Sequence, residues 1–215
     1  KLGRTDPALV RRTCRSDGVL VKPDVPLTAL ERCYLGHAYR DPIPLLAECW
    51  SDHPLGRISY LVALHAWRRD EPLDVRVSLA ELGDAAPRGR VAALDGRTGA
   101  VELLEPDATL AFTLAPRDYA FRVLAPVAHD ELAVFGDTVL FACAGDRRIR
   151  GLRASGRGIE LEVLGAPGER VTISGWSARN VSASGGEPLR RDPSTGCFSV
   201  SVEIPDRGWT PLAIE

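Results

Sequence analysis

The stretch that decides the fold is residues 159–163, IELEV, in which every second residue is apolar. Successive side chains of a strand point to opposite faces, so Ile159, Leu161 and Val163 share one face and both glutamates share the other. The same alternation returns at residues 198–204, FSVSVEI. One apolar and one polar face are typical of antiparallel sheets that cover a core on one side only.

Working outward, residues 57–67, RISYLVALHAW, are apolar on both faces, which predicts a central strand covered on two sides. Shorter alternating runs surround Phe112, Phe121 and Ile173. Turn dipeptides separate the runs, among them Asp-Gly at 95–96, Pro-Gly at 167–168 and Gly-Gly at 185–186. Short strands at this spacing predict an all-β fold, an antiparallel β-sandwich.

Helical signals are few. The run Thr5-Asp6-Pro7 is a helix start, because a capping side chain precedes a proline that fits the first turn. We expect a short helix over residues 5–15 that ends by Asp17-Gly18, and one further helical turn over residues 78–82. Charged residues and glycine near 144–152 suggest a boundary. The predicted parts are a helix at 1–16, a β-sandwich domain at 17–146 and a smaller β region at 147–215.

Composition excludes several classes of protein. The 215 residues carry a net charge of −2 and no stretch of 18 apolar residues, so neither nucleic acid nor membrane is an expected partner. The five cysteines are odd in number and show no C-x-x-C spacing, which favours a reducing, cytoplasmic setting with buried thiols; one disulfide is the alternative. Methionine does not occur, and we interpret the chain as a fragment or excised domain.

The search for chemistry yields no catalytic residue, metal site or cofactor. The four histidines have no neighbour at metal-ligand spacing, and His65 is interpreted as a hydrogen-bonded residue in or beside the core. Glu160 and Glu162 lie roughly 7 Å apart, a separation that glycoside chemistry could use, but their alternation places them on a solvated face.

Tryptophans are the remaining candidates, because a flat aromatic ring can stack on a sugar. Trp50 and Trp67 end apolar strands and are expected in the core or at an interface. Trp176 and Trp209 each follow a glycine in a turn-like context, so these two are the best candidates for exposed rings that bind carbohydrate.

The order of motifs resembles a known family. Residues 17–26 (DGVLVKPDVP) and 41–50 (DPIPLLAECW) are similar to the segment where alpha-galactosidase and raffinose-synthase-like (seed-imbibition-type) glycosidases pass from the catalytic barrel into a C-terminal β-domain. Further similar segments follow: YLVALHAW at 60–67, DGRTG at 95–99, LAPRDY at 114–119 and AVFGDT at 133–138. The chain departs from the family pattern at His65, where asparagine would be common, and at 139–141, where VLF stands in place of DKF. The similarity to these family 36-like glycoside hydrolases spans about residues 5–175.

This resemblance implies a non-catalytic C-terminal β-sandwich that packs on the (β/α)₈ barrel of the same or another chain and stabilises it. The helix at 5–15 would be the tail of the last barrel helix. The two catalytic aspartates of the family match no position here, and the parent enzyme would be a retaining glycosidase. The alternatives are a carbohydrate-binding module and one subunit of a split enzyme. An apolar patch facing the barrel, and weak homodimerisation where it is uncovered, are also expected.

Overall fold

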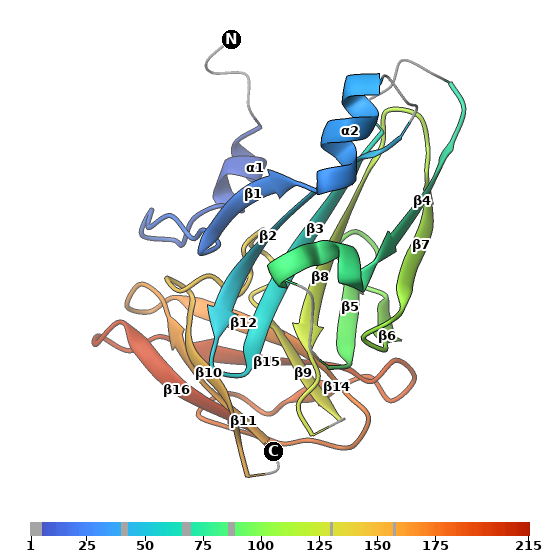
Figure 1. Ribbon diagram of the computed structural model, residues 1–215. Helices are drawn as coiled ribbons and strands as arrows, with labels where there is room; N and C mark the ends of the chain where they lie inside the picture. The colour runs from blue at the N-terminus through green and yellow to red at the C-terminus, as the bar shows by residue number, and fades with distance from the viewer. Residues whose placement is uncertain (1–5, 40–42, 66–69, 86–88, 130, 157) are drawn as a thin grey trace.

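The computed structural model describes residues 6–215 except 40–42, 66–69, 86–88, 130 and 157 (Figure 1). Its sheets are antiparallel, and the predicted all-β sandwich with a short N-terminal helix is confirmed. The first layer is a six-stranded sheet whose order is β1 (Val25–Ala29), β2 (Leu45–His53), β3 (Gly56–Leu64), β8 (Tyr119–Pro126), β5 (Val91–Asp95) and β6 (Val101–Leu104).

One face of this sheet is covered by a second, two-stranded sheet of β4 (Leu73–Ser78) and β7 (Thr109–Leu114). Alternate residues of the strands meet there in a buried apolar core that includes Leu46, Leu61, Val75, Leu110 and Leu124. The period-two pattern therefore specifies this half of the molecule directly, since every second side chain has a covering partner.

The C-terminal half is a sandwich of two four-stranded sheets (Figure 1). The first has the order β14 (Arg190–Arg191), β15 (Cys197–Glu203), β12 (Arg170–Ser177) and β9 (Leu132–Gly136); the second has the order β10 (Ile149–Ser155), β11 (Gly158–Leu164), β16 (Trp209–Ile214) and β13 (Ala183–Ser184). Ile159, Leu161 and Val163 are buried, as are Phe198 and Val200. The alternation at residues 159–163 and 198–204 therefore identifies the inner faces correctly.

The two halves meet through the other face of the six-stranded sheet. Ile58 and Tyr60 of β3 belong to the same buried apolar cluster as Ile149 and Leu161 of the C-terminal sandwich. Strand β9 lies before the predicted boundary at 146/147, yet it pairs with β12, which lies after it. The boundary itself stays a prediction.

The structure differs from the sequence prediction mainly in its helices. The predicted N-terminal helix is present but shorter, α1 (Pro7–Arg11), with Asp6 accepting a hydrogen bond from the Ala8 amide as its N-cap. The expected turn at 78–82 lies in a 3₁₀ helix, η1 (Leu79–Ala85). A further helix, which the sequence pattern did not predict, is α2 (Glu31–Tyr39) after β1. Leu30 and Cys33 are buried in the core beneath it, so tertiary packing stabilises a helix that local pattern does not announce.

Candidate docking surface

A segment at residues 12–27, which we name the strap, lies along the junction of the two halves and then joins the six-stranded sheet as β1 (Figure 1). Residues Cys14 and Leu20 pair as an antiparallel bridge around the turn at Gly18, whose φ of 81° suits glycine. The Thr13 carbonyl accepts a hydrogen bond from the Val21 amide at 2.8 Å, and the Arg12 carbonyl accepts one from Phe141 at 2.9 Å. These backbone bonds fix the strap at the junction.

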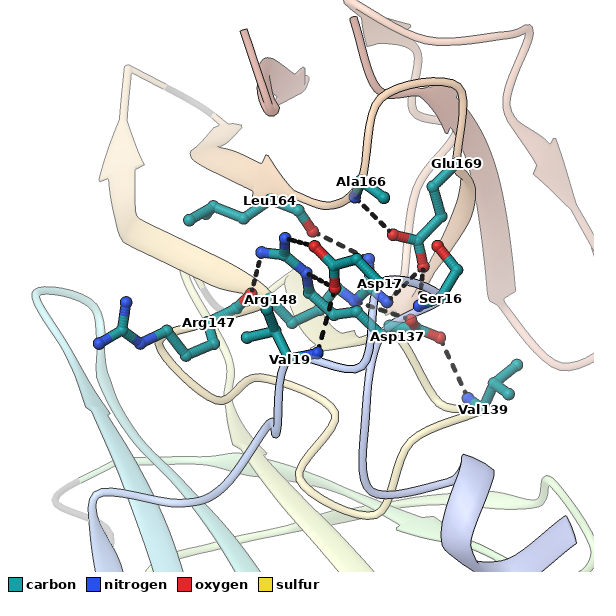
Figure 2. Close-up of polar contacts among 11 residues, drawn as sticks. Ser16, Asp17, Val19, Asp137, Val139, Arg147, Arg148, Leu164, Ala166 and Glu169 are labelled. Carbon is teal, nitrogen blue, oxygen red and sulfur yellow. Dashed lines mark hydrogen bonds and ion pairs between the residues drawn. The ribbon is translucent and has the colours of Figure 1, made fainter. Parts of the chain in front are cut away.

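Polar groups of neighbouring loops bind the strap, as Figure 2 shows. The Ser16 amide donates to Oε1 of Glu169 at 3.4 Å, and the Arg15 guanidinium donates to the Arg147 carbonyl at 3.2 Å and pairs with Asp17. The strap is thus bonded to the loops before β10 and before β12.

Arg148 is the centre of this junction and only 2% of its side chain is exposed. Its Nη2 donates to Glu169 Oε1 at 2.8 Å, its Nη1 donates to the Leu164 carbonyl at 2.8 Å, and its Nε lies 3.1 Å from Asp137 Oδ2 (Figure 2). One buried cation therefore faces two carboxylates.

The two carboxylates respond differently to this environment. Burial raises the pKa of Asp137 more than the Arg148 charge and the Val139 amide lower it, and the nearby Glu169 adds to the increase. Burial also raises the pKa of Glu169, but hydrogen bonds from Arg148 and the Ala166 amide outweigh it, so this pKa is lowered. Glu169 is consequently the firmly ionised partner of Arg148.

Between the strap and the exposed part of the six-stranded sheet lies a cleft of about 740 Å³. Its walls are mostly apolar and include Leu20, Leu27, Val62 and Tyr119, with Lys22 and Asp24 among the polar lining residues. At its floor, the rings of Tyr60 and Phe121 stack with centroids 6.4 Å apart, and Phe141 meets Phe121 edge-on at 6.2 Å. A concave apolar surface of this size suits the burial of apolar side chains or ligands.

The cleft offers little for covalent chemistry. The Cys49 thiol lines it, but burial and the nearby Glu48 raise its pKa to about 11, so it is protonated near neutral pH. The Tyr60 hydroxyl is occupied, since it accepts a hydrogen bond from the Ala144 amide at 3.0 Å and lies 3.2 Å from the Ser51 hydroxyl. The walls can bind by contact, whereas neither group is available as a nucleophile.

Exposed apolar side chains continue from the cleft across this side of the molecule. Leu20 is 57% exposed, Leu27 is 55% exposed, and Leu64 and Tyr119 lie exposed opposite each other on β3 and β8. The helix α1 buries none of its residues, leaving Leu9 and Val10 exposed, and the adjoining Arg12 guanidinium lies 4.2 Å above the Phe141 ring that lines the cleft. We call this surface, comprising α1, the strap, the cleft and the Leu64–Tyr119 pair, the apolar face.

The apolar face corrects one prediction about β3. The run at 57–67 predicts coverage on both sides, and this is right for Ile58 and Tyr60, which are buried. It is wrong further along the strand, where Val62 is half-buried and Leu64 is 38% exposed on the same face. The signal for the apolar face was therefore present in the sequence as a doubly apolar strand.

The predicted exposure of Trp176 is wrong, because the side chain is 9% exposed and packs within the large core. Gly175 misled the prediction: it is no turn residue but a tightly packed position within β12, where a Cβ would lie 2.4 Å from the Ala133 carbonyl oxygen and 2.2 Å from the Phe198 ring. Trp209 begins β16 and is half-buried, with the Arg207 guanidinium 4.2 Å from its ring. Carbohydrate binding by either residue stays a prediction.

The remaining residues that the sequence singled out are histidine, tryptophan and cysteine. His65 is buried and its Nε2 lies 2.8 Å from the Glu71 carbonyl oxygen, which confirms its interpretation as a hydrogen-bonded core residue. Trp50 is half-buried with its indole donating to Asp52 at 3.3 Å, while Trp67 lies outside the described residues. The five cysteines are free thiols. Within the described ranges, no group of three or more histidine, cysteine or acidic side chains could hold a metal ion.

Comparison of the chain with protein-family models and with curated proteins finds no match. No helix in the described part of the chain is long and apolar enough to cross a membrane.

Proposed function

We propose that this chain is a non-catalytic β-sandwich region of an alpha-galactosidase or raffinose-synthase-like glycoside hydrolase, and that it packs on the catalytic barrel and stabilises it. The observation that supports this role is the open half of β3. Val62, Leu64 and Tyr119 form an apolar sheet face that no second layer covers within the described residues, and Val62 and Tyr119 also line the mostly apolar cleft. Such a face on an antiparallel sheet is normally buried.

The apolar face has the chemistry of an interface that stays assembled. Fully burying a leucine contributes about 1.5–3 kcal/mol, and Leu20, Leu27 and Leu64 are all available on it. The strap that carries two of them is fixed by the buried Arg148 junction, so the surface is preformed and loses little conformational entropy on binding. The barrel of the same or another chain would fill the cleft with apolar side chains.

Catalysis would belong to the barrel in this proposal. The pair of carboxylates with a separation that glycoside chemistry could use, Glu160 and Glu162, is bound to arginines on a solvent-facing sheet. The free thiols support a further proposal, that the chain works in a reducing, cytoplasmic setting.

The test is to co-express this chain with the separately tagged (β/α)₈ barrel of an alpha-galactosidase from the same genome. We expect the two to co-purify and the melting temperature of the barrel to rise. A Leu20→Asp/Leu27→Asp variant should lose the association, because it places two carboxylates in an apolar interface. Leu103→Asp is the matched control, since Leu103 is also exposed but lies on β6 at the opposite edge of the sheet from β1. Failure of the wild-type chain to bind the barrel, or equal loss in the control, would contradict the proposal.

A further inference from the structure

A second concave surface lies on the outer face of the sheet β10-β11-β16-β13. Its volume is about 360 Å³, which lies within the range of small-molecule sites. Leu161 and Leu212 point their side chains into the core, so the floor is made by the alternate residues Glu160, Glu162 and Ala213. We call this surface the polar groove.

The groove is built from paired opposite charges. Arg153 on the edge strand β10 donates to Glu160 Oε2 at 2.7 Å, and the Ser155 hydroxyl donates to Glu160 Oε1 at 2.6 Å. Beside the groove, Arg150 donates to Oε2 of the lining residue Glu162 at 2.6 Å. The hydrogen bonds from Ser155 and Arg153 lower the pKa of Glu160, so Glu160 is ionised and accepts hydrogen bonds over the physiological range.

The pairs leave hydrogen-bonding capacity toward solvent. A guanidinium has five N–H donors, and the described contacts use one from each arginine. Two cations and two anions cancel, so an ionic ligand gains no net attraction from the groove. A neutral ligand that carries many hydroxyl groups can use donors and acceptors of both kinds.

The groove also has an apolar side. Pro211 lies directly across from Glu162 in the sheet and Ala213 across from Glu160, which places two small apolar surfaces beside the carboxylates. Trp209 occupies the next alternate position of β16, roughly 7 Å beyond Pro211 on the same face. Gly151 keeps one wall open, since a Cβ built there would meet nothing within 4 Å.

We propose that the polar groove binds a neutral, polyhydroxylated ligand, which is a sugar, by hydrogen bonds to the two Arg–Glu pairs and contact with Pro211 and Ala213. This binding does not depend on the proposed barrel docking, because the groove belongs to a different sheet from the apolar face.

The experiment titrates the isotopically labelled full chain with neutral maltotriose and raffinose, and with anionic trigalacturonic acid for comparison, and follows amide chemical shifts. We expect the neutral sugars to shift amides of β10, β11 and β16, and to bind more tightly than the acid. The double variant Arg153→Ala/Glu160→Ala leaves no charge unpaired and should weaken binding about tenfold or more.

The matched control is Arg170→Ala/Glu187→Ala, which removes a surface pair of similar exposure outside the groove and should leave binding unchanged. Unchanged circular dichroism and melting temperature verify that both double variants are folded. Any of three results would overturn the proposal: no shift with either neutral sugar, tighter binding of the acid, or equal weakening in the control.

Discussion

Two open sheet faces in the described part of the molecule differ in the side chains that they turn to solvent. On β11, the side chains that point away from the core are Glu160 and Glu162, each bonded to an arginine. On the exposed half of β3, the corresponding side chains are Val62 and Leu64. Charged side chains are well solvated on an exposed sheet face, whereas exposed valine and leucine favour burial against another apolar surface. The polar groove is therefore stable when exposed to solvent, whereas the apolar face suits a partner that would bury it.

The largest expected effect on stability comes from the buried ion pairs at the strap, compared with a surface ion pair beside the polar groove. Replacing Arg148 with alanine leaves Asp137 and Glu169 buried without their cation, and should lower the free energy of unfolding by about 3–5 kcal/mol. Urea denaturation measures this. The control is Arg150→Ala, whose pair is 56% and 34% exposed and should contribute at most about 1 kcal/mol. Equal losses would show that the junction under the strap is no more important than a surface pair.

A smaller effect is expected in the pH dependence of stability, where a carboxylate on a covered sheet face differs from one on an open face. Glu48 of β2 is buried, its Oε2 has no hydrogen-bond partner among the described residues, and burial raises its pKa from 4.5 to about 7 despite the charge of Arg57. Between these pH values the folded chain holds a proton that the unfolded chain releases, so stability falls as pH rises.

Glu48→Gln removes that titration. The variant should gain stability over the wild type progressively from pH 4.5 to 7, and by about 3 kcal/mol above pH 7. Denaturation at a series of pH values measures the difference. Glu160→Gln should show no gain at pH 8, because the pKa of Glu160 is lowered in the folded chain. A constant difference between Glu48→Gln and wild type at every pH would refute the assignment.

A still smaller effect concerns self-association through the apolar face. We expect the isolated chain to form a weak dimer at rising concentration, because uncovered apolar surface favours contact while association costs cancel most of the gain. Leu27→Lys should shift sedimentation toward the monomer, and Leu103→Lys should not. A strictly monomeric wild-type chain would limit the apolar face to a specific partner.

The smallest expected signal is enzymatic. Neither face combines a paired acid and nucleophile with an enclosed site in the described residues, so the purified chain should hydrolyse no aryl alpha-galactoside above the blank. Release of nitrophenol measures this. Turnover by the wild-type chain that disappears in Glu162→Gln would show that the polar groove is catalytic and would contradict a non-catalytic role.

Sequence reasoning located the strands because each alternating run has a single covering layer, as at residues 159–163 and 198–204. It missed α2, since a nine-residue helix held by Leu30 and Cys33 depends on contacts distant in sequence. It placed Trp176 in a turn because Gly175 is read as flexible, although close packing against the Phe198 ring is what requires glycine there. The Arg148 junction could not be anticipated, because its partners come from separate loops that only the fold brings together.

The bonding of the strap has a consequence for the order of events during synthesis. The bond from Ser16 to Glu169 joins residues 153 positions apart, so this anchor of the strap forms only after most of the chain has left the ribosome, later than the pairing of β1 with β2. At about 5–20 residues per second, that interval is roughly 8–30 s. Leu20 and Leu27 are exposed throughout it, and closing so long a loop comes late because its entropy must be recovered from contacts made elsewhere. The fixed position of the strap over the junction is therefore among the last features of the molecule to be completed.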